Sequence, residues 1–366
     1  MASNLSTLTR QIVEKSWKSA ICYGMPLLTR LLERDQFVPG GIYFEQIYQS
    51  ADLESLVSFY GPNTPLPGGD VEMFEKPHWH VSYMTVPVTQ TVDERVMNDK
   101  ASDAQLVNIA ETKAKAALSG IKKQMAKYIY SCVGDVEIDA SHTKLQGLVS
   151  ALMEDTTYAG IARTSSATVY PEWQAADEDN WDTAYAINKG NLNNWLDAVS
   201  EYDDEDGTYM VIMGPTLWNA LASQFESQNI YEPNKNSAKQ GFDSMWFNNV
   251  EIVKDKLLDR MAQATTKHYS SVYGGAYVHS DHANSLNAGL SGVDSTVGTS
   301  YVFILNLDTW HFRYYQDGDQ GPFEMTDFVR QSQMENGTDT DLARMMWKGQ
   351  LTCDMPNRNM MRANVS

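Results

Sequence analysis

The stretch ASDAQLVNIAETKAKAALSGIKKQMAKYIYSCV, residues 101–133, decides the fold of this chain. Its apolar residues recur at spacings of three and four, which is the period of one face of an α-helix. Ser102 followed by Gln105 forms a capping box at its start, and Gly134 suits a left-handed cap at its end. At about 1.5 Å per residue, this helix would be roughly 50 Å long. We expect its core-facing residues to be Val107, Ala110, Ala114, Leu118, Ile121, Met125 and Tyr128.

The composition indicates a globular protein with more than one lobe. The chain has 366 residues, of which 42% are apolar, and that length exceeds what one core usually holds. No apolar run is long enough to span a membrane, and the first residues lack the apolar region of a signal peptide. Three cysteines without a CxxC pair argue against a disulfide framework. A formal net charge of −19 would repel phosphates, so we expect no tight, sequence-specific binding to DNA.

The segment before the long helix has the character of an extended hairpin. Residues 42–48 and His78–Thr91 are rich in aromatic and β-branched side chains, which favour strands. Between them, Gly61–Gly69 is rich in glycine and proline and predicts a turn. An isolated two-stranded hairpin is marginally stable in water and has two unpaired edges. We therefore expect it to lie on another surface, either its own body or a neighbouring subunit.

The remaining chain predicts short helices and buried strands. Met210–Met213 is an apolar run ending at Gly214-Pro215, which predicts a buried strand followed directly by a helix. Tyr301–Asn306 is the strongest signal for a central strand. The other predicted elements are a helical arm over residues 1–35 with a short helix from Leu27, a helix over Ile187–Val199, strands over Phe242–Val253, Trp310–Tyr315 and 341–353, an exposed loop over 262–300 and a polar C-terminal tail.

No enzymatic motif stands out in the sequence. It contains no Gly-rich phosphate loop, no GxSxG elbow, no HExxH motif and no paired CxxC. His78 and His80 would share one face of a strand, as two metal ligands do, but no third ligand is near them in the sequence. We therefore expect neither an enzyme nor a bound metal or cofactor.

Three other groups of residues could form a metal or carbohydrate site. His279, Asp281 and His282 belong to a run of small polar residues that favours a solvated loop. Residues 177–206 hold ten acidic residues against one lysine, but they lack the regular calcium-binding spacing and favour a solvated surface. Paired carboxylates with tryptophans could also serve a carbohydrate-active enzyme, which stays open as an alternative.

The order of the elements resembles that of the tailed-phage major capsid protein, with its Hong Kong 97-type shell fold. That order is a helical arm, a long hairpin, one long helix, a mixed lobe with central strands and a returning strand. Several fragments are also similar to the corresponding stretches of that family. They are Pro26–Leu31 before Gly40-Gly41, Thr157–Arg163 with Trp173 after it, Gly241–Asp243 with Val250–Asp255, Phe303–Asn306 with Trp310, and Trp347–Cys353.

The resemblance implies an α+β fold with four parts. These are an N-terminal arm (1–41), an extension loop formed by a long β-hairpin (42–95), a peripheral domain (96–137 and 318–366) with the spine helix at 101–133, and a mixed axial domain (138–317). In the family the extension loop lies across an adjacent subunit. By carry-over, its tip contacts would come from Tyr60, Pro62, Asn63, Pro65, Leu66, Pro67 and Phe74.

The function that the resemblance implies is structural. The chain would assemble into pentamers and hexamers of an icosahedral shell that encloses the double-stranded DNA of a tailed bacteriophage. Its partners would be copies of itself, a scaffolding protein, a portal and a cement protein, with assembly in the host cytoplasm and a final place in the virion. Some relatives crosslink a lysine of the loop, but Tyr60–Asp70 contains none, so we expect no covalent crosslink. An encapsulin-like shell for protein cargo is the second alternative.

Overall fold

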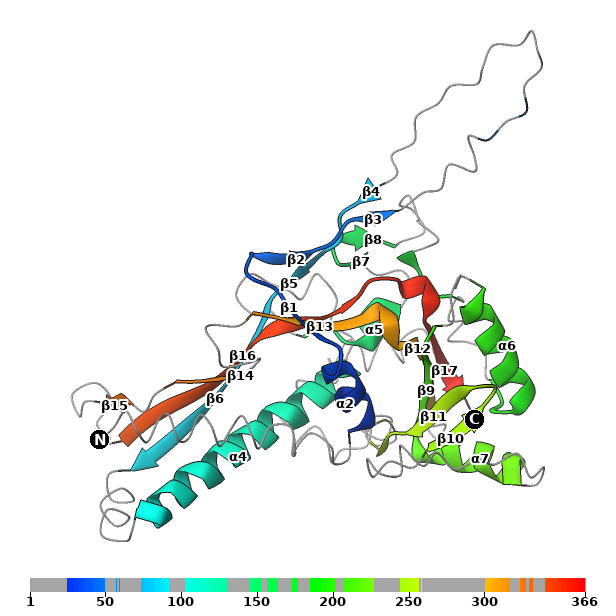
Figure 1. Ribbon diagram of the computed structural model, residues 1–366. Coiled ribbons are helices and arrows are strands. Elements are labelled where there is room, and N and C mark those ends of the chain that lie inside the picture. Colours follow the sequence, from blue (N-terminus) through cyan, green and yellow to red (C-terminus); the bar gives the residue numbers. More distant parts are fainter. Residues whose placement is uncertain are drawn as a thin grey trace, which may run out of the picture.

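The computed structural model describes the chain in segments that build two sheets and their helices (Figure 1). The described residues are 25–49, 57, 59, 74–91, 103–130, 145–152, 157–163, 173–176, 185–201, 207–226, 244–256, 258, 300–315, 323–326, 329–331 and 340–365. Within them, no helix is long and apolar enough to cross a membrane.

The larger sheet is built around one long strand, β16 (Thr340–Cys353). One side of β16 pairs antiparallel with β6 (Ser82–Thr91) over ten residue pairs. Its other side pairs antiparallel with three shorter strands, β13 (Trp310–Tyr314), β14 (Phe323–Met325) and β15 (Val329–Gln331). A further strand, β1 (Asp35–Phe37), pairs parallel with β13 at the edge of the sheet.

The long helix predicted over residues 101–133 is present as α4 (Asp103–Ile129), which lies along β6 and β16 (Figure 1). Of the predicted face, Ala114, Leu118, Ile121 and Met125 are buried, and Tyr128 is half-buried. Val107 and Ala110 belong to the helix, but their side chains lie outside the described residues, as do the two predicted caps.

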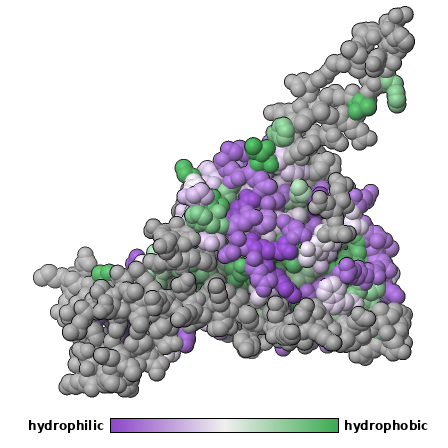
Figure 2. Space-filling model, viewed as in Figure 1, coloured by the Kyte–Doolittle hydropathy of each residue, from purple (hydrophilic) through white to green (hydrophobic). Residues whose placement is uncertain are grey.

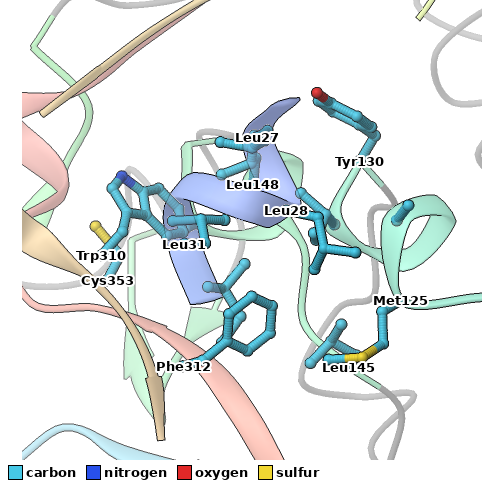
Figure 3. Close-up of a cluster of buried hydrophobic side chains, with 14 of the residues drawn as sticks. Leu27, Leu28, Leu31, Met125, Tyr130, Leu145, Leu148, Trp310, Phe312 and Cys353 are labelled. Atoms are coloured by element: carbon cyan, nitrogen blue, oxygen red, sulfur yellow. The ribbon is translucent and has the colours of Figure 1, made fainter. Parts of the chain in front are cut away.

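A short helix, α2 (Pro26–Leu32), fills the space between β13 and α4. Pro26 occupies its first turn, where a missing N–H costs nothing. Figure 3 shows Leu31 directed toward Trp310 and Phe312, while Leu28 faces the opposite side of the cluster. The ion pair of Arg30 with Glu251, at 3.3 Å, also ties α2 to the second sheet. The arm helix is therefore part of the core.

The second sheet has five strands, in the order β10 (Ser244–Phe247), β11 (Val250–Lys254), β9 (Tyr209–Met213), β12 (Ser300–Asn306) and β17 (Met360–Val365). One face packs against α6 (Lys189–Ser200) and α7 (Pro215–Glu226), and the other joins the core of the first sheet. Because both faces are buried, β9 and β12 read as continuous apolar runs. The predicted strand-to-helix turn at Pro215 and the predicted interior strand Tyr301–Asn306 are both confirmed.

Two expectations from the sequence need correction. The stretch Phe242–Val253 forms two strands, because Asn248 and Asn249 turn the chain with φ of 48° and 64°, a conformation that asparagine tolerates. The tail after Cys353 is not a polar end. It forms a 3-10 helix, η6 (Pro356–Arg358), and then β17, whose Met360 is fully buried.

The sheets do not follow the order of the chain. β13, from within 138–317, pairs with β16, whereas β17, from within 318–366, pairs with β12. A second 3-10 helix, η5 (Leu307–Thr309), joins β12 of one sheet to β13 of the other. The chain therefore passes between the two sheets at least twice, and one continuous core connects them.

Candidate assembly surface at the base of the hairpin

The predicted hairpin begins with two short antiparallel ladders above the larger sheet (Figure 1). β2 (Tyr43–Glu45) pairs with β5 (His78–His80), and β3 (Tyr48–Gln49) pairs with β4 (Phe74–Glu75). After β5, a single buried residue, Val81, leads into β6. The base of the hairpin is therefore continuous with the sheet.

Aromatic side chains hold this base against the body. Trp79 of β5 is fully buried, and its ring centroid lies 6.2 Å from Tyr158 and 6.3 Å from Trp173. Phe44 of β2 packs on Tyr315 with 4.8 Å between centroids. Burying a large apolar side chain contributes about 1.5–3 kcal/mol, so the aromatic cluster fixes the direction in which the hairpin leaves.

A buried charged group reinforces the same junction. Arg313 of β13 donates hydrogen bonds to the amide oxygen of Gln46 and to both carboxylate oxygens of Asp354, the latter at 3.0 and 3.1 Å. Its guanidinium also lies 5.4 Å from the ring centroid of Trp79. Burial raises the pKa of the Asp354 carboxyl, against the opposing charge of Arg313. Burial lowers the pKa of the neighbouring His311, although Asp354 lies 3.4 Å away.

A tight turn docks on the hairpin from the other side. β7 (Thr157–Tyr158) and β8 (Ile161–Ala162) are joined by Ala159 and Gly160, both with positive φ. The backbone N–H of His78 donates to the Ala159 carbonyl at 2.9 Å. A Cβ on Gly160 would lie 2.1 Å from Cε1 of His78, so this position requires glycine both for its φ of 79° and for the close approach.

Most of the exposed apolar residues lie in the stretch of chain that contains the hairpin. Ten large hydrophobic residues are exposed in the described part of the chain, and eight of them lie between residues 37 and 83. Figure 2 shows hydrophobic residues where the hairpin leaves the body, above a mainly hydrophilic face. This makes the hairpin and its base the candidate surface for contact with another protein. The eight are Phe37, Ile42, Tyr43, Ile47, Val57, Phe59, Phe74 and Tyr83.

The structure describes only part of the predicted loop contacts. Phe74 lies on β4 with 59% of its surface exposed. The other residues predicted to contact a neighbour, Tyr60, Pro62, Asn63, Pro65, Leu66 and Pro67, lie outside the described residues.

The structure describes two of the candidate metal ligands, His78 and His80. His78 and His80 do share one face, with ring centroids 6.0 Å apart, but Tyr43 makes edge contacts with both. Among the described residues, no group of three potential ligands is placed to hold a metal ion. His279, Asp281 and His282 and much of the acidic block at 177–206 lie outside the described residues.

Sequence reasoning missed the residues that anchor the hairpin. Arg313 and Asp354 are 41 residues apart, and Gln46 is 267 residues from Arg313. Gln350 of β16, fully buried, also donates to the His80 carbonyl at 2.9 Å. None of these positions has a local pattern that marks it, because each partner comes from a distant part of the chain.

Comparisons with known proteins agree with the architecture. The sequence matches no protein-family model and no curated protein. Among solved structures, the chain is similar to the capsid asymmetric unit of cyanophage A-1(L), with 13% identity, a TM-score of 0.59 and 93% of each chain covered. It is also similar to the capsid of a native GTA particle, with 7% identity, a TM-score of 0.50 and coverage of 92% of this chain and 90% of that one. The chain therefore has the Hong Kong 97-type fold of tailed-phage capsid proteins, as the resemblance in its sequence predicted.

Proposed function

We propose that this chain is a major capsid protein of a tailed bacteriophage. Copies of it would form pentamers and hexamers of an icosahedral shell around double-stranded DNA. The net charge of −19 supports a wall that encloses DNA without binding particular sequences. Its place would be the virion, after assembly in the host cytoplasm with a scaffolding protein, a portal and a cement protein.

The concentration of exposed apolar residues at the hairpin carries this proposal. Eight of the ten exposed large hydrophobic residues described belong to residues 37–83, while the base beneath them is anchored by buried Trp79. These side chains are exposed in the single chain. Contact with a second copy would remove them from water, and contacts that persist for the life of an assembly often bury more than about 2,000 Å².

We infer further that residues 42–95 act as the extension loop and that its tip contacts a neighbour. The contacting residues would be Tyr60, Pro62, Asn63, Pro65, Leu66, Pro67 and Phe74. The division into an arm (1–41), a peripheral domain (96–137 and 318–366) and an axial domain (138–317) belongs to the same proposal. A surface repeated by rotation gives rings, and rings of five and six together close a shell.

Electron microscopy and sedimentation of the purified chain, with and without candidate partners, test the proposal. Closed particles, rings or tubes are expected. Replacing residues 58–73 by a short Gly-Ser linker keeps the β3–β4 ladder, so the body should fold while assembly is lost. Normal particles from this variant would refute the role of the hairpin, and a wild-type chain that stays monomeric at high concentration would refute the shell.

Point variants sharpen the same test. Ile47→Ser and Phe59→Ser remove exposed apolar side chains from the hairpin, and both should weaken assembly without changing the unfolding midpoint. Val329→Ser is the matched control, because Val329 is similarly exposed but lies on β15, away from residues 37–83. The nucleic acid content of the particles separates a DNA-filled capsid from a compartment for protein cargo.

A further inference from the structure

The strand β6 has one edge that faces no strand in the described part of the chain. It pairs with β16 alone, through ten residue pairs from Ser82–Gly349 to Thr91–Thr340, without a shift in register. The sequence of β6 is SYMTVPVTQT, which carries no charge and is rich in threonine and valine. A long, uncharged, β-branched edge is a template for strand addition. The question is what keeps a second copy of the chain from pairing with it.

Hydrogen bonds of Arg344 establish which backbone groups of β6 face that edge. Arg344 donates its N–H to the hydroxyl of Thr326 at 2.8 Å, and its carbonyl accepts from the N–H of Thr326 at 2.9 Å. Both groups therefore point away from β6. Arg344 lies directly opposite Pro87, so this is a non-hydrogen-bonded pair, and the backbone of Pro87 also points outward. By alternation, Tyr83, Thr85 and Thr89 direct their backbone groups to the same edge.

Pro87 stands near the middle of this outward-facing row. It has no N–H to donate, and its ring occupies the space that an approaching strand would need. Two residues further on, the carbonyl of Thr89 already accepts a hydrogen bond from Nζ of Lys113 on α4, at 2.9 Å. An incoming strand would find no N–H donor at Pro87, and it would have to displace the Lys113 ammonium from the Thr89 carbonyl.

We infer that Pro87 and Lys113 close the free edge of β6 to strand addition by a second copy of this chain. A continuous sheet between copies is then excluded at this edge of the larger sheet. This inference does not depend on the proposed shell, because it concerns which backbone groups are available and not what the copies build.

The test uses the full-length chain with Pro87→Val and, separately, Lys113→Met. Thr85→Val is the matched control, because Thr85 faces the same edge but already has an N–H. Thioflavin T fluorescence and sedimentation, at equal protein concentration, measure polymers that form by strand addition. Each restored hydrogen bond should strengthen strand addition about two- to twelvefold, so both test variants should polymerise more than the control.

Two outcomes are decisive. Pro87→Val and Lys113→Met variants that stay folded by circular dichroism, yet form no more thioflavin-positive polymer than Thr85→Val, would overturn the inference. If Pro87→Val does not fold, Lys113→Met alone decides, because it leaves the sequence of the strand unchanged and frees the Thr89 carbonyl. Particles counted by electron microscopy in the same samples report on the shell separately, so failure of one proposal is distinguishable from failure of the other.

Discussion

Replacing Asn359 should destabilise the whole chain, because its side chain joins segments of both sheets. Its amide oxygen accepts hydrogen bonds from the indole N–H of Trp310 and the backbone N–H of Asn306, both at 2.8 Å. Its amide nitrogen donates to the carbonyl of Met355 at 2.8 Å and to the hydroxyl of Thr309 at 2.9 Å. The side chain is fully buried, so water cannot replace these partners in the folded state.

The magnitude follows from the groups that Asn359→Ala would leave unpaired. The indole N–H and the Asn306 N–H each lose this acceptor, at about 1–3 kcal/mol apiece, whereas the Met355 carbonyl keeps its hydrogen bond from the N–H of Arg358 at 3.3 Å. Thr309 loses little, because its hydroxyl already donates to the Asn306 carbonyl at 2.9 Å. We expect a loss of about 2–6 kcal/mol in the free energy of unfolding, a large part of the roughly 5–15 kcal/mol typical of a folded domain.

Urea unfolding of the unassembled chain, followed by tryptophan fluorescence and circular dichroism, measures this loss. Asn357→Ala is the control, because Asn357 is also buried but its side-chain oxygen makes no hydrogen bond among the described residues. It should cost less than about 1 kcal/mol. Asn359→Asp should be about as harmful as Asn359→Ala, since it would place a carboxylate in the core with its second oxygen against the Met355 carbonyl. Equal midpoints for Asn359→Ala and Asn357→Ala would refute the reasoning.

Two further predictions concern the base of the hairpin. Gly160→Ala should destabilise the chain by about 1–3 kcal/mol in thermal or urea unfolding, because the added Cβ meets the ring of His78. Gly120→Ala, on the open face of α4, is the control and should stabilise the chain by about 0.5–1 kcal/mol. Equal effects of the two substitutions would count against the docked turn. Because burial lowers the pKa of His311, the unfolded chain binds a proton more readily, so this part of the stability is complete above about pH 6.5 and is lost as the pH falls below it. His311→Gln should therefore reduce the drop in urea midpoint between about pH 7.5 and pH 6, and an unchanged drop would show that other groups cause it.

The elements that the sequence predicts well are those with a local signal. The face of α4 repeats over many turns, so Ala114, Leu118, Ile121 and Met125 can be placed without knowing what they contact. The runs that became β9 and β12 are apolar throughout, which indicates burial on both faces whatever the topology. Such patterns belong to a single segment, and therefore survive any arrangement of the rest.

The elements that the sequence misplaces depend on distant partners. Residues 354–366 look polar because they include Asn357, Arg358, Asn359 and Arg362, yet most of the described side chains between Asp354 and Arg362 are buried. Asn359 is tolerated there only because Trp310, Asn306 and Met355 satisfy its amide. A polar residue in a core looks the same in sequence as one on a surface until its partners are known.

The sequence by itself determined the kind of molecule: an α+β chain with a long amphipathic helix, a hairpin that needs support, and the order of elements found in phage shells. Only the tertiary structure decided how the hairpin is anchored and which edges remain open. Three features depend on residues that are far apart in the chain. They are the packing of Trp79, the pairing of Arg313 with Gln46 and Asp354, and the pairing of Pro87 with Arg344, which turns the backbone of Pro87 outward. Periodicity is a property of one segment, whereas packing and hydrogen bonding between segments exist only once the chain has folded.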